Sequence, residues 1–498
     1  MRYDKIYQQT LLRIEEATRH KLEDSHWEDM QNSNDELKTA VRLMFDIKSK
    51  FPDKEIYIVG GVPRDIIMGN DVDDVDLATN VPFPELEKHY ELHNISKNDS
   101  QPVYKIEYGG HSLDLAQFRE DLPGAVGRND NTSKLTNNFE ADTRRRDLTI
   151  NSFGLNEHGE IVDYQDGLED LKNKLVKTVG KAHDRFVEDA TRILRVARFA
   201  GKMGFVIHPE TRQAMIDLKH LIEDRNHISN ESISKEFYKA AKSGKSLRNF
   251  LEHLIDTGIL NTVLPEFMEM ESMMHDLKHH PEADGKVLGH IMECLSASKF
   301  SDPVINLGVL FHDFGKAKTY EWKDGKHTYH GHESAGVPIV GEIFNRLKFG
   351  ELSANDKRNI LIAVEKHMMI HNIDSLSIKS LVKLVNDPSW EVLKSVAYCD
   401  AAARTGLFNE NEFNKKIKDA EDKVRQLGDA DALRKRIAQH INGNILLEWL
   451  PELNTNKKLF GPILNNLKDF VLDTLNAGEE VDQDLLKNRA KQILKTQL

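Results

Sequence analysis

The carboxylates of Asp74 and Asp76 are the side chains whose types and spacing most clearly indicate chemistry. They stand at positions i and i+2, so on a strand both point to one face and can bind a divalent metal ion together. A third carboxylate, Asp114, lies in the second strand of a hairpin expected to turn at Gly109-Gly110. Three acidic side chains on neighbouring strands repel one another unless a cation lies among them. The pattern therefore predicts Mg²⁺ and a polyphosphate substrate.

The segments around these carboxylates fit a site that handles phosphate. An expected strand over residues 55–59 ends at Gly60-Gly61, where backbone amides can approach phosphate oxygens, and Arg64 follows. Arg144 to Arg146 form a basic stretch, and arginines beside a metal can clamp phosphate oxygens through bidentate bonds. The polar stretch 123–138 has the composition of a mobile loop.

Composition limits the class of protein. At 498 residues the chain should hold roughly three or four domains, and 39% hydrophobic with 30% charged residues is typical of a helix-rich soluble protein. No signal peptide and no apolar run of about 18 residues is evident, so we expect a cytoplasmic protein without a membrane segment. The net charge of −13 argues against a general nucleic-acid coat protein but permits a local basic groove. Cys294 and Cys399 are expected to be core thiols.

A second group of charges lies in a helix expected to run from Phe186 to Met203. Glu188, Asp189, Arg192 and Arg195 recur at helical spacing and should share one face. One interpretation is a ladder of surface ion pairs, each contributing about 0.3–0.5 kcal/mol. The other is that Asp189 and Arg192 present fixed hydrogen-bonding groups to the edge of a base, which discriminates bases by roughly 1–3 kcal/mol.

In order and spacing, four motifs resemble those of class II tRNA nucleotidyltransferases, the CCA-adding enzymes. The motifs are Gly60 to Asp65, Asp74 to Asp76, Arg145 to Ser152 and Glu188 to Arg195. The resemblance runs from about residue 35 to the C-terminus. It implies an α/β head with a polymerase-beta-like mixed sheet, followed by an all-α neck, body and C-terminal region. It also implies addition of CTP and ATP to the 3′ end of tRNA without a nucleic-acid template.

The resemblance also implies roles for individual residues. Asp74 and Asp76 would hold catalytic Mg²⁺, with Asp114 supporting them. Asp189 and Arg192 would read the base of CTP or ATP, and the loop 123–138 would help to switch from C to A. The other residues implied to contact or organise the bound nucleotide are Gly61, Arg64, Arg145, Arg146, Asp147, Asn151, Glu188 and Arg195.

Three positions depart from the family pattern. Pro63 stands where Val is usual and removes an amide N–H beside the phosphate loop, Leu148 replaces Phe, and Ser152 replaces Ala. Since the Asp and Arg positions are intact, nucleotide affinity is expected to differ before activity does. Bacterial poly(A) polymerases share the head motifs and remain an alternative. The basic Gly-Arg-Arg-Phe segment associated with them is missing between Asp114 and Arg144, which favours CCA addition.

A second constellation lies between residues 275 and 404, and consists of His290, His312, Asp313, His330, His332, His367, His371 and Asp400. Phe311 to Lys316, with the distant His290 and Asp400, resembles the HD superfamily of metal-dependent phosphohydrolases. The resemblance implies that His290, His312, Asp313 and Asp400 bind a divalent metal of unknown identity. It also implies that His330 and His332 bind phosphate or a second ion, and that the domain hydrolyses phosphate esters such as those of damaged RNA ends. His275, His279 and His280 are expected to be surface or turn residues.

The two resemblances divide the chain into six expected segments. These are a helical lead-in (1–50), a nucleotidyltransferase head (51–155), a neck with the base-selecting helix (156–225), an RNA-binding helical body (226–274), an HD domain (275–404) and a helical tail (405–498). The expected partners are tRNA, CTP and ATP, and the protein is expected to be a monomer or a homodimer. Two further alternatives are a phosphohydrolase whose head only holds RNA and a non-catalytic RNA-binding protein.

Overall fold

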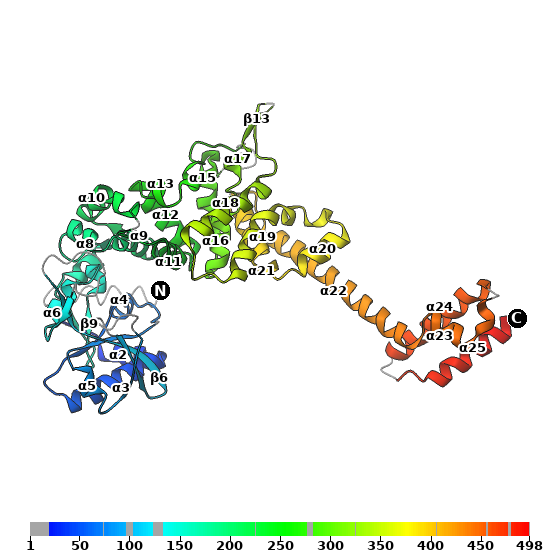
Figure 1. Cartoon of the computed structure of the whole chain (residues 1–498), viewed down its shortest axis with the longest axis horizontal. Coiled ribbons are helices and arrows are strands. Elements are labelled where there is room, and N and C mark those ends of the chain that lie inside the picture. The colour runs from blue at the N-terminus through cyan, green and yellow to red at the C-terminus, as the bar shows by residue number, and fades with distance from the viewer. Residues whose placement is uncertain are drawn as a thin grey trace. The chain divides into compact units, whose positions relative to one another are not determined.

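The structure is a computed structural model that describes residues 19–497, except 73, 96–102, 123–132, 225, 276–281, 324, 405, 455–456 and 477–479. It divides into two compact units, one made of Met1–Ile370 and Glu391–Phe408, the other of His371–Trp390 and Asn409–Leu498. Figure 1 shows the main sheet in the blue and cyan part of the chain and helices through most of the remainder. The predicted α/β head followed by a mainly helical region is confirmed.

The head is built on an eight-stranded sheet in the order β1-β10-β9-β2-β3-β6-β5-β4. Only the pairing of β3 with β6 is parallel among the strand pairs of this described sheet. The sheet takes strands from both sides of the 51–155 segment. The strands are β1 (Arg19–Lys21), β2 (Ile56–Val59), β3 (Asp76–Thr79), β4 (Glu91–Asn94), β5 (Val103–Tyr108), β6 (His111–Gln117), β9 (Gly154–Leu155) and β10 (Glu160–Val162).

Helix α3 (Asp35–Lys50) packs on β2 and β6 through an apolar stripe that includes Val41, Met44 and Ile47. It begins where the side chain of Asn34 accepts a hydrogen bond from a backbone amide of the first turn. The spacing of Leu37, Val41, Phe45 and Ile47 predicts one buried helical stripe, but Phe45 is 48% exposed. The reason is the helical period, because Phe45 lies about 100° around the helix from Met44, off the buried face.

The single helix predicted from Phe186 to Met203 is wrong. The chain forms α8 (Ala182–Glu188) and α9 (Thr191–Met203), separated by Asp189, whose backbone is extended at φ −152°. The Asp189 carboxylate accepts a hydrogen bond of 2.9 Å from the amide of Thr191, so it satisfies a free amide at the start of α9. Aspartate is a common residue at the start of a helix, so Asp189 is as consistent with the start of a new helix as with a position inside one long helix.

Helix α9 packs against α11 (Asn230–Ala240) and α12 (Gly244–Asp256). Gly201 permits the closest approach, because a Cβ there would lie 2.7 Å from the backbone nitrogen of Phe250. The following histidine-rich region is helical apart from a hairpin of β13 (Glu321–Lys323) and β14 (Lys326–Thr328). Its helices include α15 (Val287–Ala297), α16 (Pro303–Phe311), α17 (Lys316–Thr319), α18 (His332–Leu347), α19 (Ala354–His371) and α21 (Trp390–Ala403).

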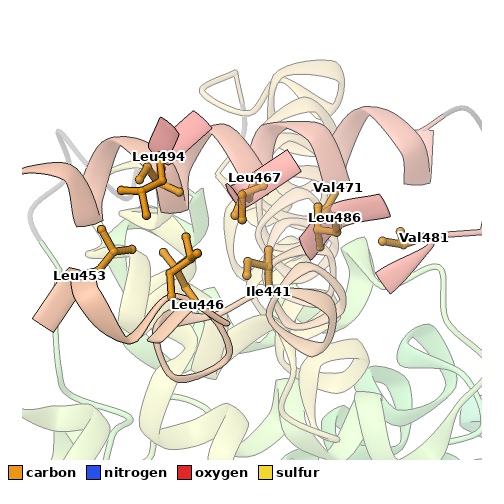
Figure 2. Packing of buried hydrophobic residues seen from close by; sticks show 11 residues of the cluster. Ile441, Leu446, Leu453, Leu467, Val471, Val481, Leu486 and Leu494 are labelled. Atoms are coloured by element: carbon orange, nitrogen blue, oxygen red, sulfur yellow. The ribbon is translucent and has the colours of Figure 1, made fainter. Parts of the chain in front are cut away.

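The other compact unit has its own core. Within it, α23 (Gly443–Trp449), α24 (Lys457–Asn476) and α25 (Gln483–Gln497) follow the long helix α22 (Glu410–His440). Figure 2 shows Leu446, Leu467, Leu486 and their neighbours pointing toward one another between these helices. Burial of this kind stabilises by about 25 cal/mol per Å² of apolar surface, so the tail has a hydrophobic core of its own. None of the described helices is long and apolar enough to cross a membrane.

Candidate active sites

Parallel pairing of β3 with β6 places Asp76 directly opposite Asp114. Asp74 lies in the turn before β3 with a positive φ of 49°, a strained conformation that aspartate tolerates better than most residues. The Glu36 carboxylate, from the first turn of α3, accepts a hydrogen bond of 3.0 Å from the amide of Val75 and holds this turn. Sequence reasoning missed Glu36, whose contact joins residues 39 positions apart.

The electrostatics of Asp76 fit a cation-binding site. Partial burial raises the pKa of its carboxyl to about 6, and Asp114, Asp74 and Glu36 act in the same direction, against the opposing charge of Arg146. Such crowding is relieved when a divalent cation lies among the carboxylates. The donors are all carboxylate oxygens, the hard ligands that Mg²⁺ prefers. The residues present therefore fit a magnesium site.

A cavity lined by Asp76 and Asp114 is also lined by the cations Arg119, Arg145 and Arg146. Buried Asp142 organises them, since it accepts a hydrogen bond of 3.1 Å from the Arg119 amide and one of 2.9 Å from the Arg146 guanidinium. The guanidinium of Arg145 is 30% exposed and lies 3.7 Å from Asp142. Sequence reasoning did not assign Arg119 or Asp142 to the site. The arrangement sets positive charge next to the expected metal site, as a triphosphate requires.

Arg64 and Asn151 are buried together behind this cavity. Arg64 is only 2% exposed. Its guanidinium donates hydrogen bonds to both carboxylate oxygens of Asp65, at 3.0 and 2.7 Å, and to the Asn151 amide oxygen. Its guanidinium also lies over the ring of Phe199 on α9. In this structure the pair therefore joins the Gly60-Gly61 segment to the motif at residues 145–152.

Pro63, the departure beside Gly61, falls in the first turn of α4 (Val62–Met68). The missing amide would have no partner within the helix there, so the substitution costs no helical hydrogen bond. Ser152 is buried and donates to the carbonyl oxygen of Leu148, which is also buried. The departures at Leu148 and Ser152 are therefore buried inside the head.

A half-buried ion pair joins the head motif to α9. Asp147 accepts hydrogen bonds from Arg195, with the closest nitrogen at 2.6 Å, and a further one from the Leu148 amide at 2.9 Å. Burial alone would raise the pKa of Asp147, but the charge and hydrogen bonds of Arg195 hold it below its usual value. Asp147 is therefore ionised at neutral pH and fixes the position of α9 against the head.

The break between α8 and α9 gathers the expected base-reading residues. The Arg192 guanidinium donates to Glu188 at 2.6 Å and to the backbone carbonyl of Arg145 at 3.0 Å. Glu188 also accepts from Arg185 at 2.7 Å. Arg192 in α9 is thus held against Arg145, which lines the cavity. Asp189 lies in the break before α9, so the two residues do not share a continuous helix face. Residues 123–132 of the expected switching loop lie outside the described residues, while 133–135 form β8 against β7 (Arg119–Asp121).

In the histidine-rich region, Asp313 faces two groups of side chains. Its Oδ2 lies 3.2 Å from Nε2 of His312 and 3.9 Å from Nε2 of His290. Its Oδ1 lies 3.2 Å from Nε2 of His332 and 3.8 Å from Nε2 of His367. A carboxylate with one oxygen toward each group has the geometry of a bridging ligand.

The histidines are oriented with Nε2 inward. On the outer side of each ring, Nδ1 donates a hydrogen bond of 2.7 to 2.9 Å. The acceptor is Glu282 for His290 and a backbone carbonyl for His312, His332 and His367. Outer-side partners of this kind orient imidazoles that bind metals. The donor atoms form two groups, and within each group all donor atoms lie within 4.8 Å of one another. The first group is His290, Cys294, His312 and Asp400, and the second is Asp313, His332 and His367. The residues present therefore fit divalent metal.

Three sequence expectations need comment here. His275, expected at the surface or in a turn, is buried and lies 3.4 Å from the Lys316 amine, so that expectation is wrong. Asp313 and His332 line a cavity, and His330 lines the same cavity. Neither His330 nor His371 belongs to either donor group. Glu282 and Cys294 were not recognised, because only the fold brings them to this site. His279 and His280 lie outside the described residues.

Two family models match the chain. The poly A polymerase head domain matches residues 56–177, and the probable RNA and SrmB-binding site of polymerase A matches residues 204–271. The first match contains the carboxylates and the arginine motif described above.

Curated relatives match over longer stretches. The Multifunctional CCA protein of Teredinibacter turnerae is 31% identical over 369 residues, which cover 71% of this chain and 86% of that protein. The Multifunctional CCA protein of Legionella pneumophila is also 31% identical, over 66% of this chain and 78% of that protein. The CCA-adding enzyme of Lactobacillus delbrueckii subsp. bulgaricus is 36% identical over 46% of this chain, and the match spans just over half, 57%, of that enzyme.

Solved structures share the fold at low identity. The Bacillus stearothermophilus CCA-adding enzyme in complex with CTP matches with a TM-score of 0.53 at 20% identity, over 92% of this chain and 98% of that one. A tRNA nucleotidyltransferase complexed with a primer tRNA and an incoming ATP analog matches with a TM-score of 0.51 at 19% identity, over 77% and 99%.

The Asp147–Arg195 pair gives a stability prediction. Arg195→Met should remove the partner of the half-buried Asp147 carboxylate and lower the stability of α9 by about 1.5–3 kcal/mol. The pair stabilises fully above the pKa of Asp147 in the unfolded chain and loses its effect as pH falls through the lower folded pKa. The difference between wild type and variant should therefore stay nearly constant from pH 7 to about 5 and shrink as pH falls below about 4.

Hydrogen exchange of the α9 amides measures this difference. Arg144→Met is the matched control, because its pair with Glu140 is exposed and should contribute only about 0.3–0.5 kcal/mol. Equal effects of the two substitutions at pH 7 would contradict the assigned role of the half-buried pair.

Proposed function

The chain belongs to the family of class II CCA-adding enzymes and their poly(A) polymerase relatives, and on that premise we propose that it builds or repairs the 3′-terminal CCA of tRNA from CTP and ATP. The observation that carries the proposal is the register of Asp76 with Asp114 beside an arginine-lined cavity. This combination sets metal-binding and triphosphate-binding groups side by side.

In the proposed reaction the 3′-hydroxyl of the tRNA attacks the α-phosphorus of the nucleotide, and pyrophosphate leaves. Asp74, Asp76 and Asp114 would hold Mg²⁺, which when bound stabilises charge on the attacking and leaving oxygens. Arg145 and Arg146 bind and orient the triphosphate through charge-assisted hydrogen bonds.

The base would be selected by the protein itself. Asp189 and Arg192 offer an acceptor and donors to the edge of the incoming base, and Glu188 and the Arg145 carbonyl keep Arg192 in place. Fixed groups of this kind discriminate between bases by roughly 1–3 kcal/mol. The Asp147–Arg195 pair positions this selector against the triphosphate site. Unlimited addition of A, as by a poly(A) polymerase, is the alternative that the head-domain match keeps open.

We further propose that the histidine-rich region is an HD-type, metal-dependent phosphohydrolase acting on phosphate esters such as those at damaged RNA ends. The supporting observation is Asp313, whose two oxygens face separate histidine groups. His290, His312, Asp313 and Asp400 would hold one divalent metal, and His332 with His367 a second. Lys316 and Arg404 line the adjoining cavity and provide positive charge for a phosphate group.

Two substitutions should separate the activities. Asp76→Asn should reduce nucleotide incorporation about a hundredfold or more, because several kcal/mol of charge stabilisation are lost, while phosphodiester hydrolysis continues. Asp313→Asn should have the opposite pattern. Both activities are measured on the full chain, with CTP incorporation into tRNA lacking CCA and with hydrolysis of bis(p-nitrophenyl) phosphate.

Asp74→Ala repeats the test at the head. Incorporation that survives both Asp76→Asn and Asp74→Ala would contradict the head assignment. Hydrolysis that survives Asp313→Asn, or is absent from the metal-loaded wild type, would contradict the phosphohydrolase assignment and leave the head assignment unaffected.

A further inference from the structure

One member of the first donor group is neither an imidazole nor a carboxylate. Cys294 lies four residues after His290 on α15, so both side chains point to the same face of the helix. Both residues are fully buried. The Cys294 sulfur lies 3.4 Å from Nε2 of His290, the ring nitrogen that faces the centre of the group.

The remaining donors point to a ligand at the same place. Nε2 of His312 is buried and makes no hydrogen bond to any described atom, although its outer nitrogen is held by the Val309 carbonyl. It lies within 4.8 Å of the Cys294 sulfur, of Nε2 of His290 and of an Asp400 oxygen. Nε2 of His290 and the Asp400 oxygen are 3.1 Å apart. Donor atoms around a tetrahedral zinc ion are separated by about 3.3–3.7 Å, so small shifts complete such a shell.

We propose that Cys294 is a thiolate ligand in this site, which together with His290, His312 and Asp400 makes it selective for Zn²⁺, Fe²⁺ or Co²⁺ over Mg²⁺. Binding replaces the thiol S–H bond by a sulfur–metal bond and releases the proton to solvent. Thiolate and imidazole favour these borderline metals, whereas the all-carboxylate head favours Mg²⁺. The chain would then keep two chemically distinct metals in separate sites.

The test uses the intact protein in excess Mg²⁺, which occupies the head, with Co²⁺ added to one equivalent. The wild type should show thiolate-to-Co²⁺ charge-transfer absorption in the near ultraviolet. Cys294→Ser should lose this absorption and bind Zn²⁺ more weakly by at least roughly tenfold. Cys399→Ser is the matched control, because Cys399 is the only other cysteine and its side chain is hydrogen-bonded to Ser298.

Charge transfer that is absent from the wild type, or that persists in Cys294→Ser, overturns the proposal. X-ray absorption of the Zn²⁺-loaded wild type gives the same answer without a variant, since a sulfur neighbour at about 2.3 Å is required. Neither readout depends on hydrolysis. A thiolate signal in a protein that hydrolyses nothing would therefore support this ligand while rejecting the phosphohydrolase function.

A different observation concerns what this site holds. The β13–β14 hairpin, which projects from the neighbouring helices in Figure 1, carries four rings on one face. Trp322 lies opposite His327 with ring centres 4.6 Å apart, and Tyr320 lies 5.7 Å from Tyr329 and 5.8 Å from His327. Trp322 is 61% exposed and Tyr320 is 42% exposed.

The ring face continues into the metal site. His327 and Tyr329 line the same cavity as Asp313, Lys316 and Arg404. Lys316 and Arg404 are therefore the cations beside the rings. Exposed rings beside cations form the surface on which unpaired bases stack while their phosphates are neutralised.

The geometry points to a single-stranded RNA 3′ end as the occupant of this face, with its terminal phosphate in the cavity. This inference rests on the proposed phosphohydrolase function for its substrate class. RNA oligonucleotides carrying a 3′-phosphate should quench the fluorescence of the wild type but not of Trp322→Phe, which retains the other tryptophans. Trp322→Ala should raise KM for an RNA 2′,3′-cyclic phosphate roughly 5- to 150-fold, as one lost stack predicts, and leave KM unchanged for glycerol 1,2-cyclic phosphate, which has the same reacting group and no aromatic ring.

Glu321→Ala, on the opposite face of the same strand, is the control and should leave KM unchanged. An absence of Trp322-dependent quenching overturns the proposal, whether or not the protein hydrolyses phosphodiesters. Quenching in a protein without hydrolysis supports the RNA surface and rejects only the phosphohydrolase. Equal changes of KM for RNA and for glycerol 1,2-cyclic phosphate would also overturn it, since stacking cannot act on a substrate without an aromatic ring.

Discussion

The half-buried pair of Asp147 and Arg195 is the interaction on which the proposed nucleotide site depends. Asp147 belongs to the segment that carries the cavity arginines, and Arg195 to the helix that begins just after Asp189. Two further contacts repeat the connection, from Arg192 to the Arg145 carbonyl and from Arg64 to Asn151 and the Phe199 ring. A half-buried charge that loses its hydrogen-bonded partner costs free energy, so these contacts together oppose separation of the head from α9. This rigidity suits a selector that must hold its donors in place without a template.

Charge also divides the chain into two kinds of chemistry. In the head, carboxylates from adjacent strands face arginines across one cavity, which suits a hard cation and a polyphosphate. In the histidine-rich region, imidazoles are aimed inward by their outer-side hydrogen bonds around a central carboxylate, and a thiol lies among them. Because the donor atoms differ, one pool of metal ions need not serve both sites.

Local patterns in the sequence predicted local structure well. The hairpin turning at Gly109-Gly110 and the strand ending before Gly60 are present, because β-branched runs and glycine turns act over a few residues. Asp76 and Asp114 were expected to be neighbours, and the parallel pairing of their strands makes them so. The sequence pattern gave the wrong answer for one helix boundary and for one residue of a buried helix face. Asp189 ends one helix and starts the next, and Phe45 falls just outside the buried stripe.

Contacts between distant segments were beyond reach of the sequence. Glu36 holds the Asp74 turn from another element, and Glu282 orients His290. From the sequence, Cys294 was predicted to be a core thiol. In the structure it lies in one donor group with His312. Motif resemblance added to spacing a prediction of which aspartates and arginines form one nucleotide site, and the fold brings Asp76, Asp114, Arg145 and Arg146 to one cavity.

The most direct test of the account follows single nucleotides on a gel. Transcripts of tRNA that end before CCA, after C and after CC are incubated with the wild-type protein, Mg²⁺ and CTP, ATP or both. A protein-held selector at Asp189 and Arg192 predicts addition of C, C and A in that order and then a stop. Unlimited addition of A, or no extension of any transcript, would contradict it.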